Sequence, residues 1–255
     1  MSEFSWDRRI VRAGELSKTH TAASELLSFY QRLAQFQKGI YQAVAAADEH
    51  DVGALVPHFI GLFKLIADVG SPALKSAAAE FEKTSVEDRL DLLIAFWQHE
   101  PESLQISSEY AFFANAVLQP FAEYLAERTD SATDSSPPLC PFCGSKPQVA
   151  VLRPEGDGAK RFLLCSLCAT EWLYRRVICP NCAEENKDKL PIFLAKEFDY
   201  VRVDACDTCR TYIKSIDLTR NGRAVPMVDE LATVSLNLWA QENNYRKLQP
   251  NLFGV

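Results

Sequence analysis

The residues of this 255-residue chain whose spacing indicates chemistry most directly are its eight cysteines. All of them belong to C-x-x-C pairs, and none lies in the first 139 residues: Cys140/Cys143, Cys165/Cys168, Cys179/Cys182 and Cys206/Cys209. A two-residue spacer lets both thiolates of a tight knuckle turn point toward one ion, so each pair supplies half of a tetrahedral site. Four half-sites predict two complete four-cysteine metal sites.

The spacing between the pairs leaves two ways to group them. Cys140 and Cys179 are 39 residues apart, Cys165 and Cys206 are 41 apart, and the flanking residues also repeat. Two copies of one module of about 40 residues favour a sequential scheme, with residues 140, 143, 165 and 168 at one ion and 179, 182, 206 and 209 at the other. Cys168 and Cys179 are separated by only ten residues, so the four inner cysteines could instead share one ion.

Each module has the layout of a rubredoxin or zinc-ribbon fold, in which two knuckles face each other across a metal. Four thiolates bind iron or zinc tetrahedrally, and the ligands alone do not choose between the two. Such a site has no open coordination position, which disfavours hydrolytic catalysis. Redox-active disulfides are the alternative, but they are expected beside a βαβ pattern that this sequence lacks. Gly144 suits the positive φ of a knuckle, whereas Ala183 at the equivalent place predicts a strained or differently turned second knuckle.

Elements on both sides of a polar segment must position these cysteines. Apolar periodicity predicts five helices between residues 20 and 128, at about 26–44, 57–67, 71–83, 85–97 and 107–128. Residues 129–138 are polar, end in two prolines and predict a linker. Short strand pairs follow at 149–152 with 161–164 and at 192–196 with 200–203, and then one helix at 228–241. The predicted fold is multidomain α+β: an all-helical domain (1–138), rubredoxin-like modules at 139–177 and 178–255, and a C-terminal helix within the second module.

Charge and composition exclude several classes of function. The net charge is −7, and the first 138 residues hold 11 Lys and Arg against 20 Asp and Glu, which is not a nucleic-acid-binding footprint. Arg8-Arg9 is not followed by an apolar export segment and is expected to be a solvated charge pair. No apolar run approaches the roughly 18–20 residues of a membrane span, so a cytoplasmic protein with reduced thiols is predicted. Four histidines without metal-site spacing are expected to be structural or solvated, and no enzyme is predicted: His20, His50, His58 and His99.

Residues 140–255 resemble the formate dehydrogenase accessory (FdhE-type) proteins. The motifs that carry the resemblance are CPFCGSKP at 140–147, LCSLCATEW at 164–172, VICPNC at 177–182, ACDTCRTYIK at 205–214 and VDELA at 228–232. Generic zinc ribbons do not combine four cysteine pairs at these spacings with Thr-Glu-Trp and the Asp-Glu-Leu-Ala helix start. The helical half has the expected length but few distinctive motifs.

The resemblance implies a cytoplasmic maturation factor, a dedicated chaperone that binds the catalytic subunit of respiratory formate dehydrogenase. It also implies two metal ions on the eight cysteines, with iron slightly favoured over zinc. An iron electron carrier of rubredoxin type is the alternative. Eight residues beside the motifs are the predicted partner contacts, because Trp and Arg are common at interface hot spots: Glu171, Trp172, Tyr174, Arg175, Arg176, Asp229, Glu230 and Trp239.

Overall fold

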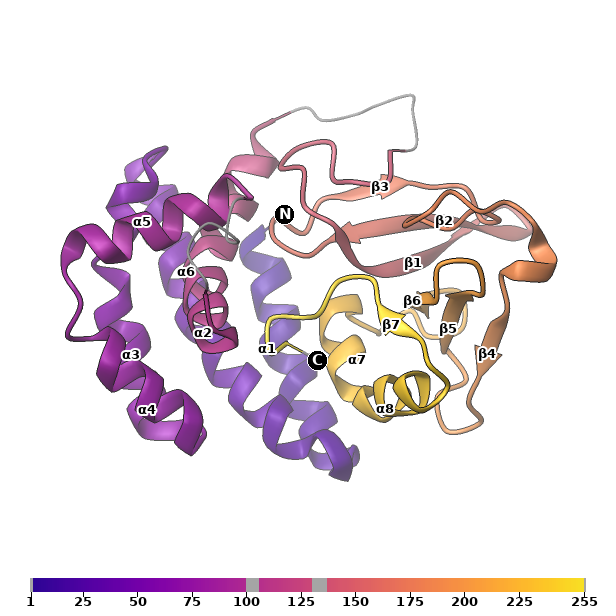
Figure 1. The fold of residues 1–255 in the computed structure, drawn as a ribbon, viewed down its shortest axis with the longest axis horizontal. Coiled ribbons are helices and arrows are strands. Elements are labelled where there is room, and N and C mark those ends of the chain that lie inside the picture. The colour runs from indigo at the N-terminus through magenta and orange to yellow at the C-terminus, as the bar shows by residue number, and fades with distance from the viewer. Residues whose placement is uncertain (1, 100–105, 130–136, 255) are drawn as a thin grey trace.

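Helices make up the N-terminal half of the computed structural model, which describes residues 2–99, 106–129 and 137–254 (Figure 1). The five helices predicted between residues 20 and 128 are confirmed, and a further helix precedes them. Ser71 caps one of them by accepting a hydrogen bond from the Leu74 amide, and Ser85 and Asp88 form a capping box on the next. The helices are α1 (Ser2–Thr19), α2 (Ser24–Ala47), α3 (His58–Val69), α4 (Pro72–Phe81), α5 (Val86–Trp97) and α6 (Ser108–Glu127).

The additional helix α1 has a polar sequence, and its buried face includes an arginine. Trp6, Arg9, Ala13 and Leu16 recur at helical spacing and are buried. Arg9 is 4% exposed, and its guanidinium pairs with the Glu123 carboxylate of α6 at 2.7 Å. The expectation of a solvated Arg8-Arg9 pair is therefore wrong for Arg9, because a buried carboxylate compensates its charge.

One apolar segment of the helical half deserves comparison with a membrane span. In the described ranges, Val52–Val69 alone is long and apolar enough by composition to cross a bilayer. The expectation that no apolar run approaches this length is thus wrong. The segment consists of a 3-10 turn (Val52–Leu55) followed by α3, and Phe59, Leu62 and Ile66 of α3 are fully buried against neighbouring helices, so α3 packs into the core of the bundle.

The C-terminal half is built on one mixed sheet. The sheet order is β3-β2-β1-β6-β5-β4, with β7 beside β6. The two predicted hairpins are present as β1–β2 and β4–β5. β6 joins them, because it pairs antiparallel with β5 and parallel with β1, from Val149 opposite Lys214 to Leu152 opposite Asp217. The two cysteine modules therefore share a sheet. Its strands are β1 (Pro147–Glu155), β2 (Gly158–Cys165), β3 (Glu171–Leu173), β4 (Ile192–Leu194), β5 (Val201–Cys206), β6 (Thr211–Asp217) and β7 (Arg246–Lys247).

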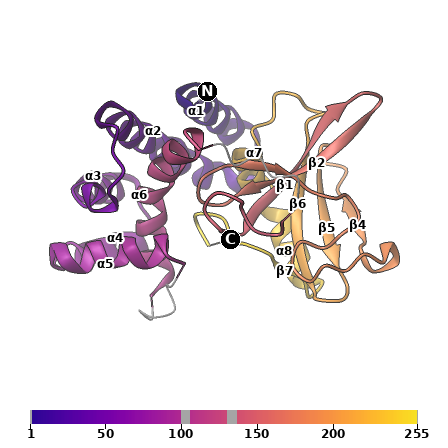
Figure 2. The same cartoon turned by 90° about the horizontal axis from the view of Figure 1, so that it is seen from above.

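Two short helices replace the single helix expected at residues 228–241. They are α7 (Pro226–Ala232) and α8 (Val234–Glu242), and the break falls at Thr233, whose backbone is not helical. The Thr233 hydroxyl donates to the carbonyls of Asp229 and Glu230, which ties the break to the preceding turn. Seen from above, α7 lies between the helical half and the sheet (Figure 2).

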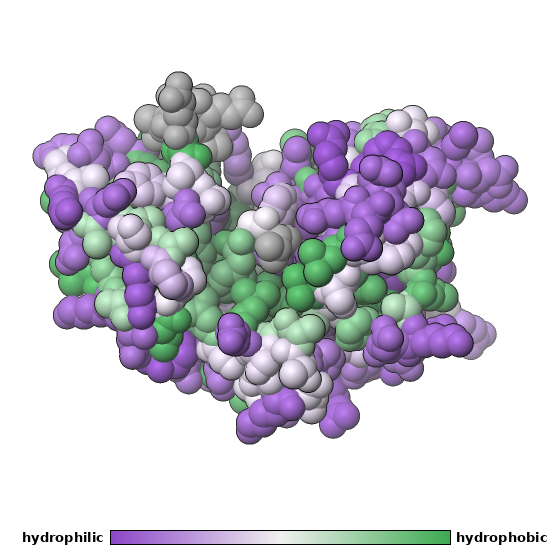
Figure 3. Space-filling view, turned by 60° about the horizontal axis from the view of Figure 1, so that its bottom comes forward, coloured by the Kyte–Doolittle hydropathy of each residue, from purple (hydrophilic) through white to green (hydrophobic). Residues whose placement is uncertain are grey.

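A continuous apolar core connects the two halves. It contains Phe113 and Phe121 from α6, Leu163 from β2, and three of the cysteines. The Gln119 side chain of α6 also donates to the Ser166 carbonyl at 2.9 Å. On the face shown in Figure 3, apolar side chains gather in the recess between the halves. Residues 130–136 of the predicted linker lie outside the described residues. The contacts between the two halves, and not the linker, show how the halves are joined.

Candidate metal centres

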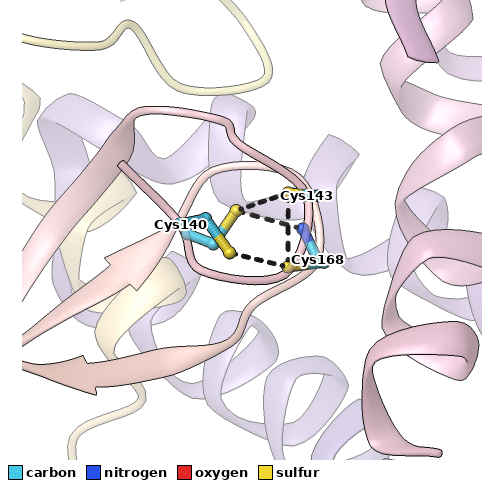
Figure 4. A group of neighbouring side chains, drawn as sticks. Cys140, Cys143 and Cys168 are labelled. Carbon is cyan, nitrogen blue, oxygen red and sulfur yellow. Dashed lines mark hydrogen bonds between the residues drawn. The ribbon is translucent and has the colours of Figure 1, made fainter. Parts of the chain in front are cut away.

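The first cysteine cluster brings together Cys140, Cys143, Cys165 and Cys168. The Cys143 sulfur lies 3.4 Å from that of Cys165 and 3.5 Å from that of Cys168, and Cys140 and Cys168 are 3.5 Å apart. Figure 4 shows the sulfurs of the labelled cysteines pointing toward one another from facing loops. One loop precedes β1 and the other follows β2, so the β1–β2 hairpin brings the two C-x-x-C pairs face to face.

The second cluster repeats this construction with Cys179, Cys182, Cys206 and Cys209. The sulfurs of Cys179 and Cys209 are 3.7 Å apart, and those of Cys182 and Cys206 are 3.6 Å apart. In each cluster all four sulfurs lie within 4.8 Å of one another. The structure thus has the sequential grouping, and the crossed grouping of the four inner cysteines is not the arrangement formed.

These separations suit four ligands around one ion. Metal–sulfur bonds of about 2.3 Å in tetrahedral geometry place neighbouring sulfurs about 3.8 Å apart. The observed distances between neighbouring sulfurs, 3.4–3.7 Å, are close to this value. The two sulfurs of a disulfide are only about 2.05 Å apart. The eight residues fit a tetrahedral Zn²⁺ or iron ion in each cluster, and a bound ion would cross-link the two knuckles.

The knuckle backbones turn in the same way in both modules. Gly144 has φ of 75° and its amide donates to the Cys140 carbonyl at 2.9 Å. Ala183 has φ of 59° and its amide donates to the Cys179 carbonyl at 3.0 Å. The expectation of a differently turned second knuckle is therefore wrong, but Ala183 does occupy the left-handed region that disfavours a side chain.

Without a metal, the four thiols of the first cluster compete for protons. Hydrogen bonds from Cys143 and Cys165 hold the pKa of Cys140 far below its usual value. Hydrogen bonds to Cys140 and Cys143 raise the pKa of Cys168 far above it. Some of these thiols thus ionise readily and others resist, so gathering four thiolates requires a cation that replaces the shared protons.

The thiols of the second cluster are also shifted in both directions. Burial and hydrogen bonding to neighbouring cysteines raise the pKa of Cys182 to about 12. Burial also raises the pKa of Cys209, but hydrogen bonds from Thr211 and Asn181 outweigh it and lower the pKa to about 6. The Thr211 hydroxyl lies 3.0 Å from the Cys209 sulfur, and Thr170 lies 3.1 Å from Cys168 in the first cluster. Both clusters therefore carry a threonine hydroxyl that can stabilise a thiolate.

The surroundings of the two clusters differ. Cys140, Cys165 and Cys168 belong to the core shared with the helices. His99, just beyond the end of α5, donates through Nε2 to the Cys143 carbonyl, a contact that sequence reasoning missed because 44 residues separate the two. Cys182 of the second cluster is exposed. The helical half thus supports the first cluster directly and leaves the second at the surface.

Four of the predicted partner contacts are buried and cannot serve as such in this structure. Asp229 and Glu230 are fully buried, and Trp172 and Tyr174 are 6% and 4% exposed. Trp172 Nε1 donates to the Pro137 carbonyl, and Tyr174 packs beside Arg161. Of the rest, Arg175 and Arg176 are exposed, whereas Glu171 and Trp239 are partly buried.

Asp229 and Glu230 instead join elements. Asp229 accepts hydrogen bonds from Arg12 of α1, from the Tyr200 hydroxyl at 2.8 Å and from the Val225 amide at 2.7 Å. Glu230 lies 2.8 Å from the buried Lys214 ammonium of β6. Sequence reasoning placed both carboxylates at a helix start, and only the buried cations reveal that they connect α7 to α1 and to the sheet.

Comparisons with known proteins agree with this arrangement. Residues 139–176 match the family described as FdhE, central domain, and residues 177–253 match FdhE, C-terminal domain. A protein FdhE homolog from Aquifex aeolicus is 35% identical over 210 residues, which cover 81% of this chain and 72% of that protein. An FdhE protein of Escherichia coli is 28% identical over 195 residues, with 74% and 62% covered.

The fold is also that of a solved relative. The crystal structure of the FdhE protein from Pseudomonas aeruginosa superposes with a TM-score of 0.75 at 23% identity, and the match covers 99% of this chain and 96% of that one. With several relatives, including the Escherichia coli protein, the chain matches less than two thirds of the relative's length. The extent of the match to the Aquifex protein, the two domain matches and the shared motifs lead to one conclusion: the chain belongs to the FdhE family of formate dehydrogenase accessory proteins.

Proposed function

We propose that this protein is a cytoplasmic, non-catalytic maturation factor that binds the catalytic subunit of a respiratory formate dehydrogenase. Family membership supports the link to formate dehydrogenase, and the two four-cysteine clusters on one sheet support a non-catalytic binding role. Closed four-ligand sites leave no position for substrate. A surface held together by metal cross-links is suited to holding a partner rather than to transforming it.

The eight cysteines are proposed to hold two ions, either iron or zinc. The sulfur separations and the paired threonine hydroxyls support this assignment. A bound dication supplies the charge that lets four neighbouring thiols lose their protons together. The knuckles are short and carry few apolar side chains of their own, so such cross-links are expected to stabilise them.

Electron transfer through an iron site is a second candidate, because the exposed Cys182 brings the second cluster to the surface. A visible absorption spectrum of protein purified without oxygen distinguishes the two candidate functions. A four-thiolate ferric site absorbs visible light, whereas a zinc site does not. A colourless protein that contains two equivalents of zinc would exclude the electron-transfer role and leave the binding role intact.

Two arginines beside the second cluster are the exposed residues proposed to contact the partner. Arg175 and Arg176 lie in the segment between β3 and the first cysteine of that cluster. Arg175 pairs with Glu185 at 2.7 Å, and Arg176 donates to the Ala159 carbonyl at 3.4 Å. Both guanidiniums keep exposed N–H groups that could donate hydrogen bonds to a carboxylate or carbonyl of the partner.

The test is a pull-down with purified components. The tagged, metal-loaded protein is mixed with the formate dehydrogenase catalytic subunit isolated before export, and retention is measured. Retention with a dissociation constant below roughly 10 μM supports the proposal. No retention of a folded catalytic subunit by the folded, loaded protein contradicts it.

Matched variants locate the contact. Replacing Arg175 and Arg176 together by alanine should weaken retention at least about tenfold, a loss in the range of an interface hot spot. The control replaces Arg32 of α2, an exposed arginine that pairs with Asp68 in the helical half, and should leave retention unchanged. Equal retention by both variants would move the contact away from this segment.

A further inference from the structure

The two clusters offer the same four ligands but are packed very differently. In the first cluster, Cys140, Cys165 and Cys168 are 4%, 0% and 3% exposed, and all three lie in the core that spans both halves of the molecule. In the second cluster Cys182 is exposed and Cys209 is half-buried. Cys179 and Cys206 are buried, at 4% and 1% exposed, but within the described residues neither packs into the two apolar clusters that join the elements.

The contacts that hold the knuckles differ in the same sense. The helical half fixes the first cluster from outside the module, through His99 on the Cys143 carbonyl and Gln119 on the Ser166 carbonyl. The second cluster receives no such support from the helical half among the described residues: the buried Tyr174 hydroxyl, from the same sheet region, donates to the Cys179 carbonyl at 3.5 Å, and the pairs Arg175–Glu185 and Thr208–Glu184 around it are exposed. Exposed pairs of this kind add little stability.

Open space also borders the second cluster from the inner side. A cavity of about 230 Å³ is lined by Cys179 and Cys206 together with apolar side chains such as Ile178, Leu190 and Ile213. The two buried cysteines of this cluster therefore border a hollow in place of a filled apolar core. Local opening costs little where few apolar contacts must be broken, so the second knuckle pair opens more readily than the first.

From these differences we propose that the second cluster is a metal-exchange site and the first a permanent structural site. This proposal rests on the proposed binding of one ion by each cluster. An incoming thiolate approaches the exposed side of Cys182 and donates its sulfur electron pair to the ion. Cys182 leaves with the electron pair of its own bond and takes up a proton from water, so the oxidation state of the ion does not change. The same exchange at Cys209, and then at Cys179 and Cys206, would break the three remaining bonds, each thiolate leaving with its own electron pair, and the ion would pass to the incoming thiolates.

The test follows both sites in the same full-length protein. The chain is loaded with cadmium-113, and two cadmium resonances are expected. The variant Cys182→Ser assigns the second site, because it shifts that resonance and not the other. The probe is the dithiol 2,3-dimercaptopropanesulfonate. The second-site resonance should disappear at least about tenfold faster than the first, since local opening governs the rate.

A control variant tests the packing argument itself. His99→Ala removes the donor to the Cys143 carbonyl and should accelerate loss from the first site alone. Equal loss rates at the two sites, or faster loss from the first, would overturn the proposal. Binding of fewer than two cadmium equivalents by folded protein would instead overturn the proposed pair of metal sites, and this proposal with it.

Discussion

The substitution Glu230→Gln tests whether the buried carboxylate of the Asp-Glu-Leu-Ala motif holds the molecule together. Glu230 lies 2.8 Å from the Lys214 ammonium and 2.5 Å from that of Lys247, and it accepts a hydrogen bond from Asn251 at 3.0 Å. Lys214 and Glu230 are fully buried. The substitution preserves shape while removing the only charge on Glu230, so the two lysines lose their shared counter-ion.

The expected cost is that of breaking a buried ion pair, about 3–5 kcal/mol. Lys214 keeps its hydrogen bonds to the Glu230 and Thr233 carbonyls, which places the expected value toward the lower end of that range. For a chain of this size each kcal/mol lowers the melting temperature by about 2–4 °C. A fall of about 6–12 °C is therefore expected.

The assay is urea unfolding followed by circular dichroism on metal-loaded protein, with thermal melting as a second measurement. The matched control is Glu185→Gln, which removes a carboxylate from an exposed ion pair with Arg175 and should produce no measurable change. Adding Lys214→Met to Glu230→Gln should recover part of the lost stability, because one uncompensated cation is gone. If Glu230→Gln unfolds at the same urea concentration as the parent, the reasoning is refuted.

Other consequences follow from the same structure. Burial raises the pKa of Glu230, but the neighbouring ammonium groups of Lys214 and Lys247 outweigh burial and lower this pKa from an ordinary 4.5 to about 2. The contribution of the Glu230 carboxylate to stability is therefore complete above pH 4.5 and is lost as the pH falls toward 2. Urea unfolding of Glu230→Gln should be less pH-dependent than that of the parent in this window. Ala183→Gly should raise the free energy of unfolding by about 0.5–1 kcal/mol by relieving the left-handed backbone, and Gly144→Ala should lower it by a similar amount; chemical denaturation measures both. Asp229→Asn should speed amide hydrogen exchange in α1 and α7, because it weakens the contact with Arg12, and unchanged exchange there would count against that link.

The cysteine grouping could be predicted because a local pattern specifies it. A C-x-x-C pair at each end of a hairpin needs only strand pairing to come together, and the repeat of Cys140 and Cys165 in Cys179 and Cys206 indicated which pairs combine. The helices from residue 20 to 128 were equally accessible, because their apolar stripes and caps are local signals.

The features that the sequence did not reveal depend on charges that become buried through distant partners. Arg9 was expected to be solvated, yet Glu123, 114 residues away, compensates its charge, and Asp229, 217 residues away, does the same for Arg12. For the same reason Asp229 and Glu230 looked like surface contacts. The parallel pairing of β1 with β6 also has no local signal, because it joins strands from different hairpins.

Metal content tests the central claim most directly. The protein is purified without oxygen or chelator, and bound transition metals are measured per chain by elemental analysis. Two ions per chain are predicted, falling to one in Cys140→Ser/Cys143→Ser and to one in Cys179→Ser/Cys182→Ser. A stably folded parent protein that carries less than one bound ion would contradict the account.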